Sequence, residues 1–208
     1  MKTLSTLLTV LSIGCAQPLI GDGDFVDEER DLADFDGVET YGVNVEVRAG
    51  KAWSFTVSTD ENLLSHIHTE VIDGVLRIDT DTEIYPSSLS AVVVTPILTM
   101  VGNHDGADLR AVDIDANRLE VMASSEGHTE LAGRVGMLVV SSTGSGVRNA
   151  ADLIAADVEI SSTGSGVAWL TATETIEGEL SSAVTLNVFG DPRRKAVVAY
   201  DASEVIYY

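Results

Sequence analysis

Ser-Ser-Thr-Gly-Ser-Gly-Val stands at residues 141–147, and the same seven residues return at 161–167. The spacing is 20 residues, and another Ser-Ser pair follows at 181–182, again 20 residues later. Apolar residues precede each copy in the same phase: Leu138 and Val140, then Val158 and Ile160, then Leu180. A fixed period of about 20 residues is typical of a solenoid, in which each repeat forms one coil that packs on the next.

The repeat predicts parallel β-structure. At roughly 3.3 Å per extended residue, 20 residues make a coil of a few short strands, and equivalent strands of successive coils pair in parallel. The glycines of the repeat mark a corner, where positive φ or close approach of the next coil favours glycine. The corner residues are Gly144, Ser145 and Gly146, then Gly164, Ser165 and Gly166. Looser copies at 103–106 and 124–127 extend the predicted coils over residues 96–192.

Residues 25–95 have a different pattern, which predicts antiparallel hairpins. Val43, Val45 and Val47 alternate with polar residues, as in a half-buried strand. Asp73-Gly74 separates two short apolar pairs and is a strong signal for a two-residue hairpin turn. We expect this region to cover one end of the solenoid, because open ends recruit other chains. Residues 193–208 are predicted to cap the other end with Tyr200, Tyr207 and Tyr208.

The N-terminus is predicted to be a targeting segment. In residues 1–14, Lys2 precedes an apolar run that is too short to span a bilayer but suits a signal peptide. The run ends at Cys15, the only cysteine, in a context that resembles a bacterial lipobox. Lipidation of Cys15 would leave residues 15–24 as a tether, and Ala16 instead of Asp after it favours the outer membrane. The alternative is a buried free cysteine.

Composition limits the function. The chain has 208 residues, with 33 Asp and Glu against 12 Lys and Arg, a formal net charge of -21. That balance argues against sequence-independent nucleic-acid binding and against a polybasic membrane contact, since both need cationic side chains. Loose binding of divalent cations and adaptation to high salt would both produce such a surface, and the sequence does not separate them.

Further motifs occur in a fixed order along the chain. Arg30 to Val38 is followed by Gly42-Val43-Asn44, by residues 59–64 and 73–78, by the two Gly-Ser-Gly turns, and by Gly190-Asp191-Pro192. In this order they resemble the putative auto-transporter adhesins with a head GIN domain, over about residues 21–192. Val43 replaces the Ile of the GIN signature, and residues 181–184 lack the Gly-Ser-Gly.

The resemblance implies an all-β fold: a right-handed parallel β-helix of pectin-lyase-like shape, forming one domain over residues 25–208. It also implies a role in cell adhesion and no recognisable set of catalytic residues. Gly190 and Pro192 match the terminal Gly-x-Pro motif of the family, while Gly42, Val43 and Asn44 carry its signature.

Two groups of residues are candidate metal ligands. His66 and His68 are two apart in a predicted strand and would point to one face, as a two-histidine site needs, with His104 and His128 as further candidates. The alternative, which we favour, is four exposed or locally bonded histidines. Acidic runs at 79–83 and 113–117 begin like calcium loops but lack the glycine required at the sixth position, which leaves at most a weak surface calcium contact. No cofactor is expected.

The one basic cluster, Arg193-Arg194-Lys195, could serve a polysaccharide lyase as base, or could be a charged loop after the last coil. Three functions therefore remain open. The first is a non-catalytic envelope protein that is adhesive or structural and binds an unknown surface glycan or protein. The second is a carbohydrate-active lyase or hydrolase that uses the groove of the β-helix. The third is a periplasmic ligand-binding or scaffold protein.

Overall fold

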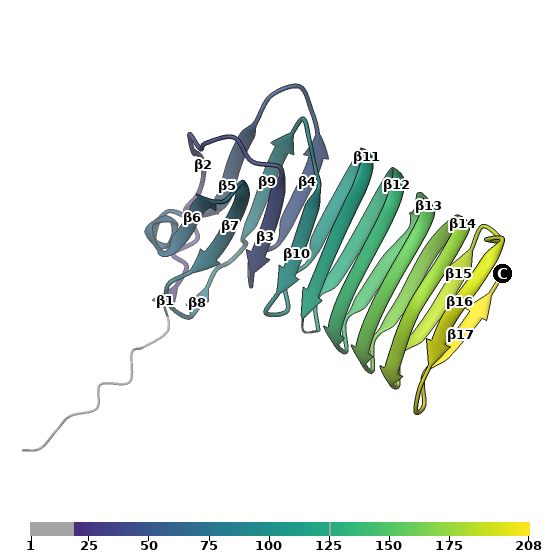
Figure 1. Cartoon of the computed structure of the whole chain (residues 1–208). Helices are drawn as coiled ribbons and strands as arrows, with labels where there is room; N and C mark the ends of the chain where they lie inside the picture. Colours follow the sequence, from purple (N-terminus) through teal and green to yellow (C-terminus); the bar gives the residue numbers. More distant parts are fainter. Residues whose placement is uncertain (1–18, 125) are drawn as a thin grey trace, which may run out of the picture.

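The computed structural model describes residues 19–124 and 126–208, which are almost entirely β-strand (Figure 1). One short 3-10 helix, η1 (Glu61–His66), interrupts the strands. The strands are β1 (Leu19–Ile20), β2 (Phe25–Glu29), β3 (Gly37–Tyr41), β4 (Val45–Ala49), β5 (Ser54–Asp60), β6 (Ile67–Ile72), β7 (Val75–Thr80), β8 (Ile84–Tyr85), β9 (Ser90–Thr95), β10 (Met100–His104), β11 (Leu109–Ser124), β12 (His128–Gly144), β13 (Val147–Gly164), β14 (Val167–Ser182), β15 (Thr185–Phe189), β16 (Arg194–Ala199) and β17 (Glu204–Tyr207). Within the described ranges no helix is long and apolar enough to cross a membrane.

The predicted β-solenoid is confirmed. β11, β12, β13 and β14 are each 16 to 18 residues long, bend around the axis and pair in parallel with the next coil (Figure 1). Gly144 pairs with Gly164, so the two copies of the seven-residue sequence stack directly. The repeat thus forms corners that lie one above the other.

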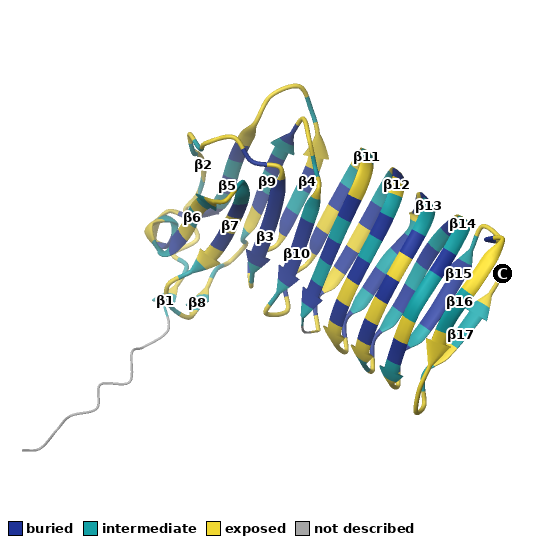
Figure 2. Ribbon diagram, in the orientation of Figure 1, coloured by how far each residue is buried: buried dark blue, intermediate teal, exposed yellow. Residues whose placement is uncertain are grey.

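The core is a set of ladders inside the coils. Leu138, Val158 and Ile176 are consecutive partners in register, and each is at most 1% exposed. Buried and exposed residues alternate along β11 to β14 (Figure 2), as the period-2 pattern of a strand requires. Each fully buried Leu or Ile contributes about 1.5–3 kcal/mol of transfer free energy, so a few residues per coil supply most of its stability.

The third repeat differs from the sequence prediction. Ser181 pairs with Thr163, and Ser162 pairs with Leu180, so β14 is advanced by two residues relative to β13. The register shifts occur between Ala150 and Asp157. Because side chains alternate with period 2, a shift of two residues keeps every side chain on its own face. The core therefore stays apolar although the 20-residue period becomes 18 in this coil.

The N-terminal half contains the predicted antiparallel pairs, but it also contributes to the parallel stack. β2 with β5, β5 with β9 and β6 with β7 are antiparallel. In contrast, β3 pairs in parallel with β10, and β4 with β11, so residues 37–49 form a coil of the solenoid. The alternation at Val43, Val45 and Val47 did predict a strand, but alternation does not distinguish a parallel partner from an antiparallel one.

Residues 193–208 continue the stack instead of folding across its end. β16 pairs in parallel with β14, and β17 pairs in parallel with β15. Tyr200, Tyr207 and Tyr208, which we expected as covering side chains, are 49%, 38% and 66% exposed. This segment covers the layer before it and leaves its own outer side open.

Candidate binding face

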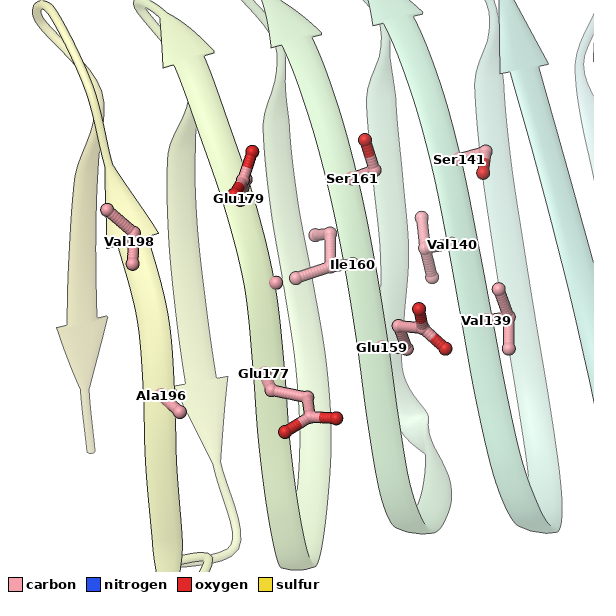
Figure 3. A pocket seen from close by; sticks show the side chains of 11 residues that line it. Val139, Val140, Ser141, Glu159, Ile160, Ser161, Glu177, Glu179, Ala196 and Val198 are labelled. Carbon is pink, nitrogen blue, oxygen red and sulfur yellow. The ribbon is translucent and has the colours of Figure 1, made fainter.

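A candidate site lies on the outer surface of the sheet formed by the second halves of β12, β13 and β14 and by β16. A shallow groove of about 460 Å³ runs across these strands (Figure 3). Its side chains come from two rows, in which residues of successive coils are register partners. The first row is Val139, Glu159, Glu177 and Ala196, and the second is Ser141, Ser161, Glu179 and Val198.

Negative charge in the groove is only partly compensated. Strands of successive coils lie about 4.8 Å apart, so the carboxylates of Glu159 and Glu177 repel each other. Arg194 compensates the negative charge of Glu177 through an ion pair of 3.0 Å. No ion pair within 4.0 Å reaches Glu159 or Glu179 from the residues that the structure describes. These two carboxylates are free to accept hydrogen bonds or to attract a cation.

The shape of the face suits an extended ligand. The side chains of Glu159, Glu177 and Glu179 project from neighbouring coils on one side of the sheet (Figure 3). The hydroxyl groups of Ser141 and Ser161 lie beside them and can donate or accept. The groove is open rather than enclosed, so it can hold a chain laid across several coils but cannot exclude water from a reacting atom.

Each cation of the basic cluster, residues 193–195, forms an ion pair. Arg193 lies 3.2 Å from Glu174, and Lys195 Nζ lies 2.8 Å from Asp191 Oδ1. With Arg194 on Glu177, all three cations have an acidic neighbour. The Lys195 contact holds the pKa of the Asp191 carboxyl below its usual value. The cluster is not a loop, as one interpretation of the sequence had it, because Arg194 and Lys195 are the first two residues of β16.

The side chains of His66 and His68 both contact the carboxylate of Asp81, but the two residues do not lie in one strand as predicted. His66 ends the 3-10 helix and His68 lies in β6. Their ring nitrogens lie 3.0 and 3.2 Å from the two carboxylate oxygens of Asp81. Hydrogen bonds from His68 and His66 lower the pKa of the Asp81 carboxyl.

The other two predicted histidines lie apart from this pair. His104 stacks on Tyr41, and its Nδ1 lies 2.6 Å from Ser124 Oγ. His128 lies 3.4 Å from Asp108 at the start of β12. Outside residues 1–18 and 125, no three His, Cys, Asp or Glu side chains are grouped to hold a metal ion, and this includes both predicted calcium segments, 79–83 and 113–117.

The signature residues Gly42, Val43 and Asn44 form a corner of the solenoid. Gly42 has φ +71°, which favours glycine, and the Val43 side chain is fully buried. The side-chain oxygen of Asn44 accepts a hydrogen bond of 2.9 Å from the backbone N–H of Asp108 in the next coil. The signature therefore has a structural explanation.

The repeated turns also serve the backbone. A Cβ at Gly164 would lie 2.2 Å from the carbonyl oxygen of Gly144, so only glycine allows the coils to approach. Gly190 has φ +92°, and Pro192 follows it in the connection from β15 to β16. Ser145 and Ser165 are both exposed at the corners.

Arg148, Asp60 and Glu39 are buried charged residues that were not predicted. Arg148 is 6% exposed inside the coils, where it donates to the backbone carbonyls of Gly146 and Thr143. Burial lowers the pKa of its guanidinium. One feature of the sequence indicates that Arg148 is buried. Its register partner in the following coil is the apolar residue Ala168.

Asp60 is fully buried at the end of β5. Its two carboxylate oxygens accept hydrogen bonds of 2.7 Å from Gly23 N–H and 2.8 Å from Ser87 N–H. Burial would raise the pKa of the Asp60 carboxyl, but these N–H groups outweigh burial and lower it. Asp60 thereby joins the segment after β1 to the body. Cys15, the predicted lipidation site, lies outside the described residues.

Comparison with known proteins assigns the family. The profile of the family described as "Putative auto-transporter adhesin, head GIN domain" matches residues 34–192. The chain belongs to this family. A search of proteins with curated functions finds no match.

Solved structures share the fold of this GIN-domain chain. A putative adhesin from Bacteroides fragilis has a TM-score of 0.71 at 16% identity, covering 91% of this chain and all of its own. A putative adhesin from Parabacteroides merdae has a TM-score of 0.63 at 17% identity, covering 93% and 100%. A putative lipid binding protein from Parabacteroides distasonis has a TM-score of 0.56 at 18% identity, covering 92% and 100%.

Proposed function

We propose that this protein is a non-catalytic adhesin of the bacterial cell envelope that binds a hydroxyl-rich surface glycan along the groove of β12, β13, β14 and β16. The observation that supports it most directly is the pair of carboxylates at Glu159 and Glu179, which have no ion-pair partner among the described residues. Carboxylates accept hydrogen bonds from sugar hydroxyls, and such charge-assisted bonds are stronger than neutral ones.

The open shape favours binding over catalysis. Electrostatic stabilisation of a transition state is strongest in a preorganised site that excludes water, and this groove is open to solvent. The family's name and the names of its structural relatives refer to adhesion, which supports the same conclusion. The tests below can also give other outcomes. The ligand could prove to be a surface protein. The function could prove to be that of a carbohydrate-active enzyme, or of a periplasmic ligand-binding or scaffold protein.

The groove can be tested with Glu159→Gln and Glu179→Gln, singly and together. The purified chain is applied to an array of bacterial and host glycans, and bound ligands are measured by titration. We expect the double variant to weaken binding about tenfold or more, because each charged hydrogen bond contributes about 1.5–3 kcal/mol. Glu204→Gln, at the far turn of the last coil, is the matched control and should bind like wild type. Equal affinity in the double variant would contradict the groove as the site.

Catalysis can be tested on the same preparation. Incubation with acidic polysaccharides should give no shortened products. Product formation that disappears when Arg193 and Arg194 are replaced by Ala would overturn the non-catalytic proposal.

The envelope location rests on Cys15. The first described strand, β1, lies at the far end of the molecule from β17 (Figure 1), so a lipid on Cys15 would attach the solenoid by its N-terminal end. Ile20 and Tyr85, paired neighbours in β1 and β8, are 71% and 52% exposed beside this point, as a membrane-facing edge would require. Ala16 in place of Asp favours the outer membrane.

The anchor can be tested by radioactive palmitate labelling in a bacterial host. We expect label in the wild type and none in Cys15→Ala. Fractionation of the envelope then reports the membrane. Label that persists in Cys15→Ala, or a wild type without label, would contradict the anchor.

A further inference from the structure

The last coil leaves a cross-section of the hydrophobic core uncovered. In the structure of residues 19–124 and 126–208, no strand pairs with the outer edge of β16 or of β17. Val197 continues the interior row of Ile160 and Gly178, and Val205 continues that of Leu186. Leu186 is 0% exposed, whereas Val197 and Val205 are only partly buried. The layer that would cover these residues is not supplied by the described chain.

The surroundings of this edge are also apolar. Val198, Tyr200, Tyr207 and Tyr208 are all more than a third exposed, and β16 is one of the most exposed strands in Figure 2. Unpaired N–H and C=O groups on an exposed edge form a template for another strand. An uncovered core layer beside such an edge resembles a domain interior cut in half, as in stable homodimer interfaces.

The opposite end of the molecule is protected. One of its edge strands, β2, carries three consecutive acids, Asp27, Glu28 and Glu29. Arg30 joins β2 to the neighbouring layer by donating to the carbonyl of Ile67 at 2.6 Å. Charged residues on an edge strand are a common means of preventing association. The edge of β2 thus differs from that of β16, where no acid stands between Lys195 and Asp201.

Positive and negative side chains lie on opposite sides of the open end. Arg193, Arg194 and Lys195 lie where β16 begins, and Lys195 Nζ is 4.9 Å from the ring of Tyr207, where β17 ends. Asp201 and Glu204 lie at the turn between the two strands. Arg193 and Arg194 pair with Glu174 and Glu177 of the preceding coil. Within residues 191–208, Asp191 is the one acid beside these cations, so this side has an excess of cations and the other side carries only acids.

This arrangement is complementary to itself. A twofold axis that lies in the plane of the open end, perpendicular to the strands, reverses the direction of β16 and of β17 in a second copy. β16 then meets β16, and β17 meets β17, both antiparallel. The basic side of each copy faces the acidic side of the other. The same rotation places Val197 and Val205 of one copy against those of the other, as an isologous contact requires.

We propose that the C-terminal coil binds the C-terminal coil of a second copy end to end, through antiparallel pairing of β16 with β16 and of β17 with β17. The N-terminal ends of such a dimer point away from each other, because β1 and β17 lie at opposite ends of each copy (Figure 1). If each copy is anchored through Cys15, as in the proposed function on which this consequence rests, the dimer joins two opposing membranes. The protein is then an adhesin whose partner is its own copy on another cell.

Sedimentation analysis tests the contact in solution. The full chain carries Cys15→Ser in every variant, so that neither lipid nor a disulfide joins two copies. We expect a concentration-dependent dimer. Val197→Lys places a charge in the core layer and should raise the dissociation constant about tenfold or more. Ile72→Lys, an exposed apolar residue of β6 at the opposite end of the molecule, is the matched control and should leave it within about threefold.

The folded state of each variant is checked by circular dichroism and thermal unfolding. If Val197→Lys does not fold, Val205→Lys on β17 removes the same contact from the other strand. A monomer at all concentrations, or a dimer that Val197→Lys and Val205→Lys leave unchanged, would overturn the proposal. Assembly beyond the dimer would also overturn it, because an isologous contact closes after two copies.

Attachment to beads tests the orientation. Coupling through Cys15 leaves the C-terminal ends free, and these beads should clump together. Coupling through Tyr208→Cys in the Cys15→Ser chain blocks the same ends, and these beads should stay dispersed. Clumping in both cases, or only in the second, would contradict end-to-end binding. Glu159→Gln with Glu179→Gln should not alter clumping, so failure of the glycan site and failure of this contact are distinguishable.

Discussion

The coils of β12 and β13 and the N-terminal region around β2 and β5 are held together in different ways. In the coils, the backbones of equivalent residues stack on one another. Gly164 lies so close to its partner Gly144 that a Cβ at Gly164 would be 2.2 Å from the Gly144 carbonyl oxygen. In the N-terminal region, individual polar side chains join segments far apart in sequence, as Asp60 joins the residues after β1 to the loop before β9. The difference indicates that the coils depend on the repeat of local sequence, whereas the N-terminal region depends on individual polar contacts between distant segments.

The largest effect is expected from a substitution that disrupts the stacking of the coils. Gly164→Ala places a Cβ at 2.2 Å from the Gly144 carbonyl oxygen and imposes a φ of +131° on alanine. We expect a loss of about 3 kcal/mol or more in the free energy of unfolding, because both strain and displacement of the neighbouring coil contribute. Urea denaturation measures it.

A matched control separates the two causes. Gly106 also has a positive φ, +78°, but nothing lies within 4 Å of a Cβ there. Gly106→Ala should cost only about 1 kcal/mol, from backbone strain. Equal losses at the two positions would show that close approach of the coils is unimportant.

A smaller effect is expected for the polar contact inside the coils. Arg148→Met keeps most of the side-chain volume but leaves the carbonyls of Gly146 and Thr143 without this donor. We expect a loss of about 2 kcal/mol, because hydrogen bonds from a charged donor to the backbone are lost. Arg110→Met, whose side chain is 49% exposed in surface ion pairs, should cost less than about 1 kcal/mol. A stabilised Arg148→Met protein would contradict this role.

The smallest and most specific effect concerns Asp60 in the N-terminal region. Its folded pKa is lowered, so its contribution to stability is present above the unfolded pKa and is lost as the pH falls through the folded pKa. Wild type should therefore lose stability below about pH 4, the ordinary range of an Asp carboxyl. Asp60→Asn should be less stable at pH 7 and should lose less stability on acidification. Thermal unfolding from pH 7 to pH 3 measures both, and parallel curves would contradict the prediction.

The sequence predicted those features that repeat or that follow from local pattern. The identical heptapeptides predicted stacked coils, and Asp73-Gly74 predicted the turn between β6 and β7. The two-residue slip of β14 could not be predicted, because Ser181-Ser182 preserves the apparent 20-residue period while Leu180 fits the interior in either register. Strand direction in residues 37–49 depends on partners about 60 residues away, which alternation does not encode.

The candidate site was less predictable. Glu159 and Glu179 come from repeats that look alike, and the same two-residue slip sets Glu179 beside Ser161. His66 and His68 were identified as a pair, but Asp81 joins them only because the hairpin of β6 and β7 folds back. The open edge at β16 was expected to be a cap, since tyrosines that cover a core and tyrosines that surround an open one look the same in sequence.

The identity of the two seven-residue corners also bears on how the gene can change. Removing residues 145–164 would join Gly144 to Ser165 and restore the same Ser-Ser-Thr-Gly-Ser-Gly-Val sequence at the junction. Recombination between the two copies can therefore delete or duplicate one whole coil without creating a new corner. Each event would alter the length of the molecule by one strand spacing, about 4.8 Å, so its reach could evolve in steps.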